Sequence, residues 1–324
     1  MEEVFKNRID LRALHESVDK IKAEIAKVIV GQDATIELLI AAIFSKGHVL
    51  IEGVPGVAKT LTAKLLARAI DADFSRIQFT PDLMPSDVIG TSVFNPKTTD
   101  FEFRKGPLFS NLILIDEINR APAKTQAALF EVMEERQITT DGHTYHMQEP
   151  YLVLATQNPI EQEGTYRLPE AQLDRFLFKL VAGYPTLDEE IKILQFNQKE
   201  ELNVQIKSID KVLNAEQIIS FRQLIRQVYV EDKVINYLAQ IAHESRANAS
   251  LFLGASPRAT VAILNASKAL AAIRGRDFVT PEDIKLVCVP ALRHRLILTP
   301  EREMEGANID EVIKQLVNKI EVPR

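Results

Sequence analysis

The chain has 324 residues, more than the roughly 250 to 300 at which a single hydrophobic core usually stops growing, so two domains are expected. Hydrophobic residues make up 46% of the sequence and charged residues 26%, which excludes a disordered or fibrous chain. The net charge of -6 and the pI near 5.7 provide no overall attraction for a nucleic-acid backbone.

The single cysteine and the apolar runs indicate the compartment. Cys288 cannot form an internal disulfide, and it lies in the apolar run 286–289, where packing in a core is its expected role. The amino terminus MEEVFKNRID is charged and lacks the apolar core of a signal peptide. The longest apolar run, 38–44, is far shorter than the ~20 residues of a membrane helix. We therefore expect a cytoplasmic protein without membrane insertion.

The first expected element is an amphipathic helix. Its apolar residues recur at three- and four-residue steps and form one stripe, which comprises Leu11, Leu14, Val18, Ile21, Ile25 and Val28. This spacing is typical of a helix that packs against a core, so no chemistry is assigned to it.

Short apolar runs then alternate with helical patterns up to about Tyr184. The expected strands are 48–51, 76–79, 111–115, 151–155 and 176–181, and the clearest helices between them are 60–70 and 124–135. Several of these strands are almost continuously apolar, as in strands that a parallel sheet buries on both faces. Residues 1–184 are therefore expected to form a doubly wound α/β domain whose ligand site lies beyond the carboxyl ends of its strands.

The sequence pattern changes after Pro185. The strand pattern ends there and helical patterns follow, for example at 234–242 and 260–273. Another helix is expected to begin at Thr280-Pro281, where a capping hydroxyl precedes a proline in the first helical position. We therefore expect residues 185–324 to form a second, smaller, all-α domain.

The segment GVPGVAKT, 53–60, follows the first expected strand and opens the next helix. In this position a glycine-rich turn directs backbone N–H groups at a phosphate, and the positive end of the following helix assists. Lys59 is expected to reach the β- and γ-phosphates of ATP, and Thr60 to ligate Mg²⁺. The residues expected to contact the nucleotide are Gly53, Val54, Pro55, Gly56, Val57, Ala58, Lys59, Thr60 and Leu61.

Ala58 departs from the usual phosphate-binding pattern, which has glycine immediately before the lysine. A methyl group is compatible with right-handed helical geometry at this position, whereas a larger side chain would crowd the phosphates. We therefore expect the alanine to be a minor departure that leaves the loop able to bind a nucleotide.

An acidic pair follows the expected strand 111–115. An ATPase needs one carboxylate near Mg²⁺ and another to polarise the attacking water, and we assign these roles to Asp116 and Glu117, respectively. By itself, segment 53–60 is also consistent with a structural glycine turn, and the acidic pair with a solvated turn. The occurrence of both, in this order and each after a strand, favours a nucleotide site.

Five segments together resemble the MoxR family of AAA+ ATPases. In chain order they are GVPGVAKT, LILIDEINRAP, ATQNPIEQEGTY, LPEAQLDRF and GASPRA, and the resemblance covers nearly the whole chain. It implies a P-loop NTPase fold with a helical lid, and ATP hydrolysis with ATP and Mg²⁺ as cofactors. It also implies a ring of identical subunits, expected to be a hexamer.

The resemblance assigns roles to two further residues of the α/β domain. Asn158 matches the polar residue that senses the γ-phosphate, and its amide would orient the water with Glu117. Arg175 matches the arginine finger, which acts on ATP held by the neighbouring subunit and stabilises charge in the transition state. The alternative for Arg175 is an ion pair with Asp174 or Glu170.

Ser256-Pro257-Arg258 resembles the second sensor of these ATPases. Ser256 would cap a helix that Pro257 begins, and Arg258 would reach from the lid to the γ-phosphate, so that closure of the lid depends on ATP. An arginine in the first turn opposes the helix dipole, which favours a functional role. Arg120 is a further candidate for the subunit interface.

Two insertions are expected in the α/β domain. Segment 137–145 carries Asp141-Gly142 between strand-like flanks, which is the strongest short signal for a hairpin. Segment 93–104 alternates aromatic with polar residues and resembles the helix-2 insert of this branch of AAA+ proteins. By resemblance, such loops face the ring pore and the partner. Arg167 stands where the family has proline, and no function is attached to it.

We expect a chaperone-like ATPase that remodels or activates client proteins, including by insertion of metal cofactors. The resemblance also implies partners with von Willebrand factor A-type domains. The alternative is a nucleic-acid motor subunit, but the expected hairpins supply few cations, chiefly Lys97, Arg104, Lys105 and Arg136. Nucleic acid is therefore not the expected partner. A nucleotide-gated scaffold is disfavoured because it needs none of Glu117, Asn158 and Arg175.

Overall fold

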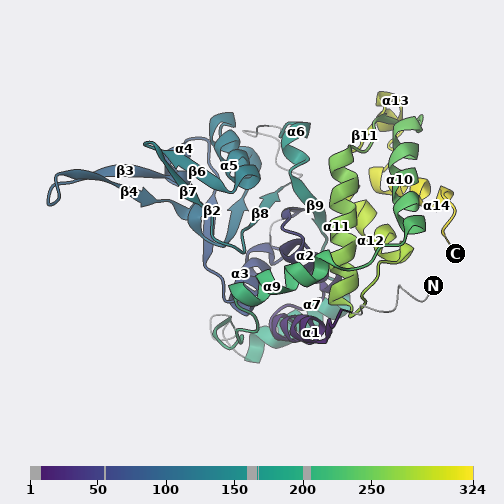
Figure 1. Cartoon of the computed structure of the whole chain (residues 1–324), viewed down its shortest axis with the longest axis horizontal. Coiled ribbons are helices and arrows are strands. Elements are labelled where there is room, and N and C mark those ends of the chain that lie inside the picture. Colours follow the sequence, from purple (N-terminus) through teal and green to yellow (C-terminus); the bar gives the residue numbers. More distant parts are fainter. Residues whose placement is uncertain (1–8, 55, 159–165, 167, 200–205, 324) are drawn as a thin grey trace.

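The computed structural model describes residues 9–54, 56–158, 166, 168–199 and 206–323 (Figure 1). Pro55 and Arg167, both named above, lie outside the described residues. The α/β part and a bundle of helices lie side by side, and a long hairpin projects from the α/β part on the side away from the bundle.

A five-stranded parallel sheet with strand order β2-β5-β8-β1-β9 forms the centre of the α/β part. Its strands are β1 (His48–Gly53), β2 (Phe74–Gln78), β5 (Leu112–Asp116), β8 (Leu152–Gln157) and β9 (Phe176–Ala182). All five strands expected from the apolar runs are confirmed. Because the strands are parallel, their carboxyl ends meet at one edge of the sheet and their amino ends at the opposite edge.

Helices cover both faces of this sheet. They are α1 (Arg12–Ala26), α2 (Asp33–Phe44) and α3 (Lys59–Ala69) on one face, and α4 (Pro85–Ile89) and α5 (Ala123–Glu135) on the other. In β1, Val49 and Ile51 belong to the core that contains α2 and α3, whereas Leu50 belongs to the core that contains α5. This alternation explains why the strand sequences are apolar at nearly every position.

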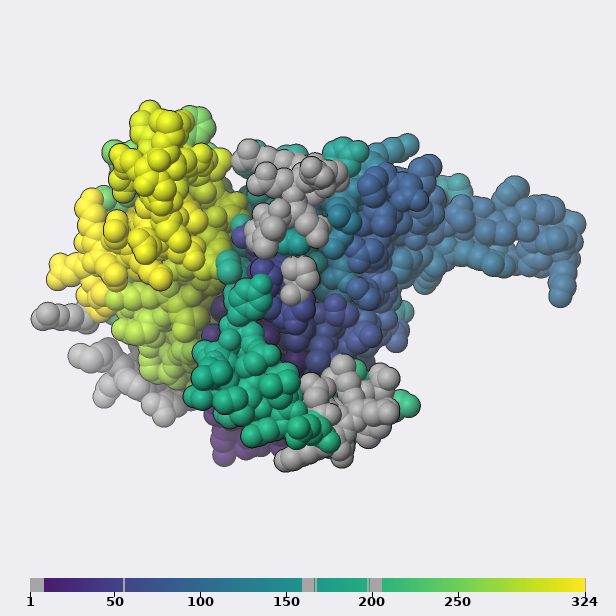
Figure 2. All heavy atoms as spheres, turned by 180° about the vertical axis from the view of Figure 1, so that it is seen from behind, coloured from purple at the N-terminus to yellow at the C-terminus, as the bar shows by residue number. Residues whose placement is uncertain are grey.

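Two antiparallel hairpins extend the α/β part. They are β3 (Gly90–Asn95) with β4 (Asp100–Lys105), and β6 (Gln137–Thr140) with β7 (His143–His146). The β3–β4 hairpin projects far from the body of the molecule (Figures 1 and 2). Asp141 and Gly142 both have positive φ, as a two-residue hairpin turn requires. Phe103 of β4 stacks on Tyr145 of β7 with ring centroids 4.8 Å apart, so the two hairpins are joined.

The second half of the chain is helical apart from one short strand pair. Its elements are α7 (Leu187–Lys199), α9 (Ala215–Arg226), α10 (Asp232–Ala247), β10 (Leu251–Leu253), α11 (Pro257–Ile273), α12 (Pro281–Leu292), β11 (Ile297–Leu298), α13 (Pro300–Met304) and α14 (Ile309–Lys319). α9 packs on α2, whereas α10 to α14 form the lid, in which α11 contacts both α2 and α12. Among the described helices, none combines the length and the apolarity that crossing a membrane requires.

Three consecutive lid residues, Arg293, His294 and Arg295, attach the lid to β9, the edge strand of the sheet. Arg295 is 7% exposed and donates to the carbonyls of Phe176 (2.7 Å) and Leu177 (3.1 Å). His294 Nε2 lies 2.9 Å from the Phe176 carbonyl, and Arg293 donates to the carbonyl of Lys179 at 3.3 Å. Two arginines and one buried histidine, whose pKa burial holds well below its ordinary value, thus contact backbone carbonyls of the edge strand and fix the lid there.

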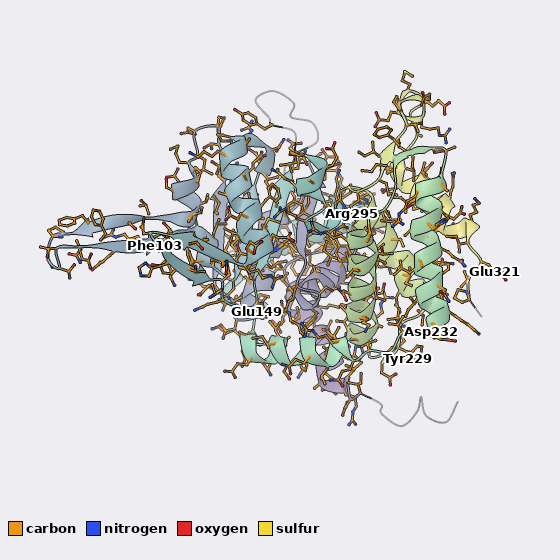
Figure 3. All side chains as sticks on the ribbon, turned by 45° about the horizontal axis from the view of Figure 1, so that its top comes forward. Phe103, Glu149, Tyr229, Asp232, Arg295 and Glu321 are labelled. Carbon is orange, nitrogen blue, oxygen red and sulfur yellow. The ribbon has the colours of Figure 1, made fainter. Side chains whose placement is uncertain are left out.

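Arg295 also bonds the residue that precedes Arg175. Its Nε donates to Asp174 Oδ1 at 2.6 Å, and its Nη2 donates to the Asp174 carbonyl at 3.0 Å. Figure 3 shows Arg295 at the junction between the lid helices and the sheet. The position of the lid is therefore tied directly to the start of β9.

Replacing Arg295 by methionine should test this attachment. The variant leaves the Asp174 carboxylate and several carbonyls without a buried donor, and we expect its free energy of unfolding to fall by about 3 kcal/mol. Urea denaturation measures the change. The matched control is Lys319→Met, which removes an exposed pair with Glu244 and should cost less than about 1 kcal/mol. Equal losses in the two variants would contradict the attachment.

Candidate functional site

The phosphate loop stands at the carboxyl end of β1. Gly53 closes the strand and α3 begins at Lys59, as expected from the sequence. Gly56 has φ of +89°, in the region that favours glycine. Lys59 Nζ donates to the Gly53 carbonyl at 2.7 Å, so the ammonium group folds back across the loop. The loop therefore presents a lysine and the positive end of α3 at one place.

The acidic pair lies close to this lysine. Burial lowers the pKa of Lys59, and the charges of Asp116 and Glu117 oppose that shift. The three side chains are therefore near enough to influence one another. The phosphate loop and the end of β5 thus lie close together at the carboxyl ends of the strands.

Ala58 is the residue of this loop for which the expected backbone conformation is wrong. It precedes α3 with φ of +58° and ψ of +17°, which is left-handed rather than right-handed. An L residue in this conformation is less stable by roughly 1–2 kcal/mol, whereas glycine adopts it with little steric cost. The left-handed conformation thus falls at the residue that caps the start of α3.

Asp116 is held by side chains from the two strands that flank β5. It is 8% exposed, and its Oδ2 accepts from Arg76 Nε of β2 at 2.6 Å. Its Oδ1 accepts from Thr156 Oγ1 of β8 at 3.2 Å, and Thr156 Oγ1 also accepts from the backbone N–H of Glu117 at 3.1 Å. Neighbouring strands thus fix both acidic residues. Sequence reasoning did not identify Arg76, the first residue of the expected strand 76–79, or Thr156, which follows the expected strand 151–155.

Glu117 has a left-handed backbone, with φ of +57°, and begins the short helix η2 (Ile118–Arg120). Its Oε2 accepts from Gln78 Nε2 of β2 at 2.9 Å and lies 3.2 Å from Arg120 Nη1. Arg120, expected as an interface residue, therefore pairs with Glu117 of its own subunit.

Asn158 follows β8 and is 9% exposed. β8 lies between β5 and β1, so Asn158 stands at the same edge of the sheet.

The donor set fits Mg²⁺. Thr60 in the first turn of α3 and Asp116 at the end of β5 offer oxygen ligands, which this ion prefers, and Mg²⁺ usually keeps several waters. Within the described ranges, no group of three or more His, Cys, Asp or Glu side chains could hold a metal ion. Mg²⁺ would therefore need phosphate oxygens in addition to Thr60 and Asp116, and Arg76 would have to release Asp116 Oδ2.

A cavity of about 400 Å³ opens beside the loop, between the chain that precedes α2, the end of β9 and α7. Its walls are largely apolar and include Val30, Leu61, Tyr184 and Ile193. Apolar cavities of this size are typical of small-molecule sites. Except for the loop residues themselves, the sequence reasoning missed this cavity, because its walls come from three distant segments.

Gly31 keeps this cavity compact. Its φ is +72°, and a Cβ at this position would lie 2.2 Å from Glu189 Oε1 of α7. The backbone N–H and hydroxyl of Thr186 donate to Glu189 and lower the pKa of its carboxyl. The Glu189 carboxylate of α7 thus lies directly over Gly31, which precedes α2.

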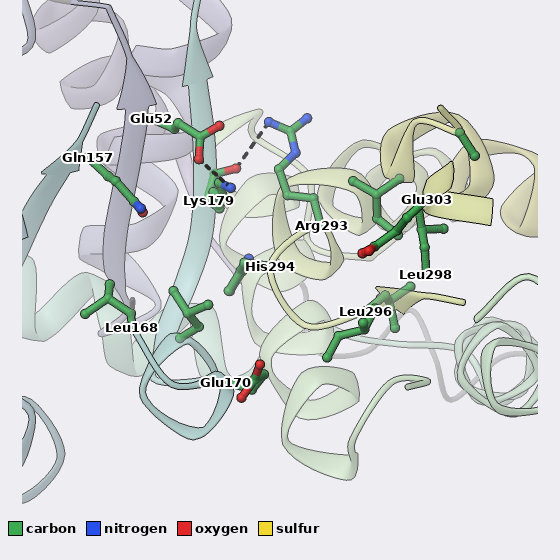
Figure 4. Close-up of a pocket in the computed structure, with 14 residues that line it drawn as sticks. Glu52, Gln157, Leu168, Glu170, Lys179, Arg293, His294, Leu296, Leu298 and Glu303 are labelled. Atoms are coloured by element: carbon green, nitrogen blue, oxygen red, sulfur yellow. Dashed lines mark hydrogen bonds and ion pairs between the residues drawn. The ribbon is translucent and has the colours of Figure 1, made fainter. Parts of the chain in front are cut away.

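A second cavity, of about 450 Å³, separates the carboxyl ends of β1, β8 and β9 from the lid (Figure 4). Glu52 and Lys179 form an ion pair of 2.5 Å on its sheet wall, and Arg293 and His294 belong to its lid wall. No described residue of 54–60 lines this cavity. Across this cavity the lid faces Glu52 of β1, Gln157 of β8 and Lys179 of β9.

Arg175 lies at the amino ends of the strands, whereas the phosphate loop lies at their carboxyl ends. It immediately precedes β9, where Phe176 pairs with His48, whereas Gly53 pairs with Ala182. The five residue steps between these pairs separate the two ends of the strands by about 15–20 Å. Arg175 Nη1 donates to the Phe130 carbonyl at 2.6 Å.

Arg258 lies beside Arg175 and not beside the phosphate loop. Ser256 caps α11 and Pro257 begins it, as expected. Arg258 Nη2 pairs with Glu134 at 3.0 Å, and its Nη1 lies 3.9 Å from Asp174. In this structure Arg258 is therefore not brought together with the phosphate loop of its own chain, because the attachment of the lid to β9 places the start of α11 at the amino ends of the strands.

The left-handed conformation of Ala58 predicts that glycine stabilises the protein at position 58 and destabilises it at position 127. Ala58→Gly should raise the free energy of unfolding by about 0.5 kcal/mol, whereas Ala58→Val should lower it by about 1–2 kcal/mol. Ala127→Gly, at an exposed right-handed position in α5, is the matched control and should lower it by about 1 kcal/mol. Urea denaturation measures all three. A loss of stability in Ala58→Gly as large as that of the control would show that the left-handed conformation is absent.

Comparisons with known proteins agree with this geometry. Residues 48–178 match the ATPase family associated with various cellular activities (AAA), and residues 243–316 match the AAA lid domain. The chain is 41% identical to Chaperone MoxR1 of Mycobacterium tuberculosis (strain ATCC 25618 / H37Rv) over 97% of this chain and 84% of that protein. It is 29% identical to Protein MoxR of Methylorubrum extorquens, over 95% of this chain and 96% of the relative.

A solved structure shares the complete fold. A crystal structure of a protein from Cytophaga hutchinsonii ATCC 33406 superposes with a TM-score of 0.89 at 41% identity, and the match covers 96% of this chain and 97% of that one. The phosphate loop, the acidic pair and the helical lid thus occur in the arrangement of an AAA ATPase. The chain belongs to the MoxR family of AAA+ ATPases.

Proposed function

We propose that this ATPase hydrolyses ATP at a site shared by two copies of the chain in a closed ring and uses the energy to remodel client proteins. The observation that carries the proposal is the separation between the phosphate loop and the two arginines. Arg175 and Arg258 lie at the amino ends of the strands, about 15–20 Å from the loop at the carboxyl ends. An arginine needed at the phosphate must then come from a neighbouring copy.

The residues of one chain supply the first half of this site. Lys59 and the backbone of the loop bind the phosphates, Thr60 and Asp116 hold Mg²⁺, and Glu117 polarises the attacking water. Mg²⁺ supplies charge neutralisation at the phosphate oxygens when it is bound. Asn158 orients the same water, since it stands beside β5 at the same edge of the sheet.

The neighbouring copy supplies the second half. Arg175 and Arg258 would donate to the terminal phosphate across the interface and stabilise the charge that develops during cleavage. The loop of one copy then meets the arginines of the next, which is a head-to-tail contact. Such contacts close into rings when the rotation between copies permits, and we propose a hexamer.

The cavity beside the loop is proposed to bind the base and ribose of ATP. Its apolar walls suit an aromatic base, and Leu61 joins it directly to the start of α3. Gly31 and Glu189 hold the wall formed by α7 close to that of α2. Nucleotide binding would therefore involve residues from the α/β part and from α7.

The clients are proposed to be proteins. One relative is named a chaperone, and the projecting β3–β4 hairpin carries two aromatic side chains, Phe94 and Phe101, which are 50% and 68% exposed. Activation of clients, insertion of metal cofactors and partners with von Willebrand factor A-type domains remain part of this proposal. A nucleic-acid partner has less support, because Arg136 is engaged with Glu149 and the Lys46 carbonyl inside the subunit.

Subunit mixing tests the shared site. Glu117→Gln should bind ATP but not hydrolyse it, and Arg175→Ala should fail to act on its neighbour, so each variant alone should lose at least about 100-fold in kcat. A mixture should regain activity, because an intact Arg175 then meets an intact Glu117. Steady-state ATPase assays measure this, and wild-type turnover per subunit should rise with protein concentration. A mixture as inactive as its components would contradict a shared site.

Filling the cavity tests the binding of the base. Leu61→Trp places a larger side chain in the cavity and so leaves less room for the base. It should weaken ATP binding by at least about tenfold, while the binding of inorganic tripolyphosphate should change little. Isothermal titration calorimetry with Mg²⁺ and each ligand separates the two effects. An equal loss for both ligands would mean that the substitution acts on the phosphate loop instead.

A further inference from the structure

Glu134, a charged residue outside the phosphate site, contacts both Arg175 and Arg258. It lies in the last turn of α5, and each of its two carboxylate oxygens faces a different arginine. Oε1 lies 3.0 Å from Arg258 Nη2 of the lid, and Oε2 lies 3.6 Å from Arg175 Nη1 of the α/β part. One carboxylate thus bridges the two arginines across the boundary between the two parts of the chain.

Both arginines are held on one edge and remain accessible on the other. Arg175 Nη1 is fixed by the Phe130 carbonyl and Glu134, and its side chain is 30% exposed. Arg258 is 52% exposed, with Glu134 and Asp174 as its partners. Bonds within the subunit therefore leave part of each guanidinium free to meet an anion. The three residues line one open cavity of about 200 Å³, so that anion has a place to enter.

Two guanidinium groups this close repel each other unless a negative charge lies between them. A shared carboxylate removes that repulsion and restricts both side chains to a narrow range of rotamers. Arginines held in this way lose less conformational freedom when they bind one phosphate together. Glu134 is itself 38% exposed, so its ion pairs contribute little to the stability of the fold.

We propose that Glu134 is a positioning residue, which holds Arg175 and Arg258 at a fixed spacing for the terminal phosphate of the neighbouring subunit. This inference rests on the shared site proposed above. Glu134 contacts no residue of the phosphate loop in the described structure, so it acts through the arginines and not on the nucleotide of its own subunit. Its position just before β6 also makes it the connection between the arginines and the base of that hairpin.

The test uses Glu134→Gln, which keeps the shape of the side chain and removes its charge. We expect kcat to fall about tenfold, because both arginines lose their shared anchor, while the ATP affinity of the variant stays within about twofold of wild type. The matched control is Glu135→Gln, at the next residue of the same turn, which makes no ion pair in the part of the chain that is described. An unchanged or increased kcat in Glu134→Gln would overturn the proposal, as would an equal loss in the control.

Mixing with Glu117→Gln shows where the defect acts. Glu134→Gln subunits have an intact hydrolytic site, and Glu117→Gln subunits have intact, correctly held arginines, so the mixture should exceed the activity of both components. The mixture of Arg175→Ala with Glu117→Gln is the reference. If the reference regains activity and the Glu134→Gln mixture does not, only the role of Glu134 is refuted. If the reference also stays inactive, the shared site itself is refuted.

Discussion

The parallel sheet imposes the constraint on which the rest of this structure depends. Every strand of the sheet runs in the same direction, so a residue that begins a strand and a residue that ends one are separated by the full strand length. Gly53 ends β1, and Arg175 precedes β9 beside it. No rearrangement of side chains can bring these two residues together within one chain. A catalytic site that needs both must be assembled from separate copies.

The attachment of the lid to β9 extends this constraint to the second domain. A lid on a free hinge could fold over its own nucleotide, but Arg293, His294 and Arg295 bond the backbone of the edge strand. Arg258 consequently shares a carboxylate with Arg175. The lid and the start of β9 are thus joined by several side-chain contacts. The proposed function therefore requires movement between subunits rather than closure within one.

The sequence predicted what depends on neighbours along the chain. The strands, the phosphate loop, the acidic pair and the Asp141-Gly142 turn were all recognised, because their patterns are local. The location of Arg258 was not, since it follows from contacts such as that of Arg295 with Asp174, 121 positions away. The left-handed conformation of Ala58 was missed because alanine rarely adopts it, whereas the glycine usual at this position adopts it with little steric cost. Glu134 was not singled out, because in the sequence it looks like any solvent-exposed acidic residue of a helix.

The stacking of Phe103 on Tyr145 has a mechanical consequence for the projecting hairpin. An isolated two-stranded ribbon in water is only marginally stable, so β3–β4 needs support at its base. The stacked rings give it that support and connect it to β7, whose hairpin begins one turn after Glu134. The ribbon is therefore anchored to the body of the molecule by the aromatic pair, while its tip lies far from that support (Figure 1).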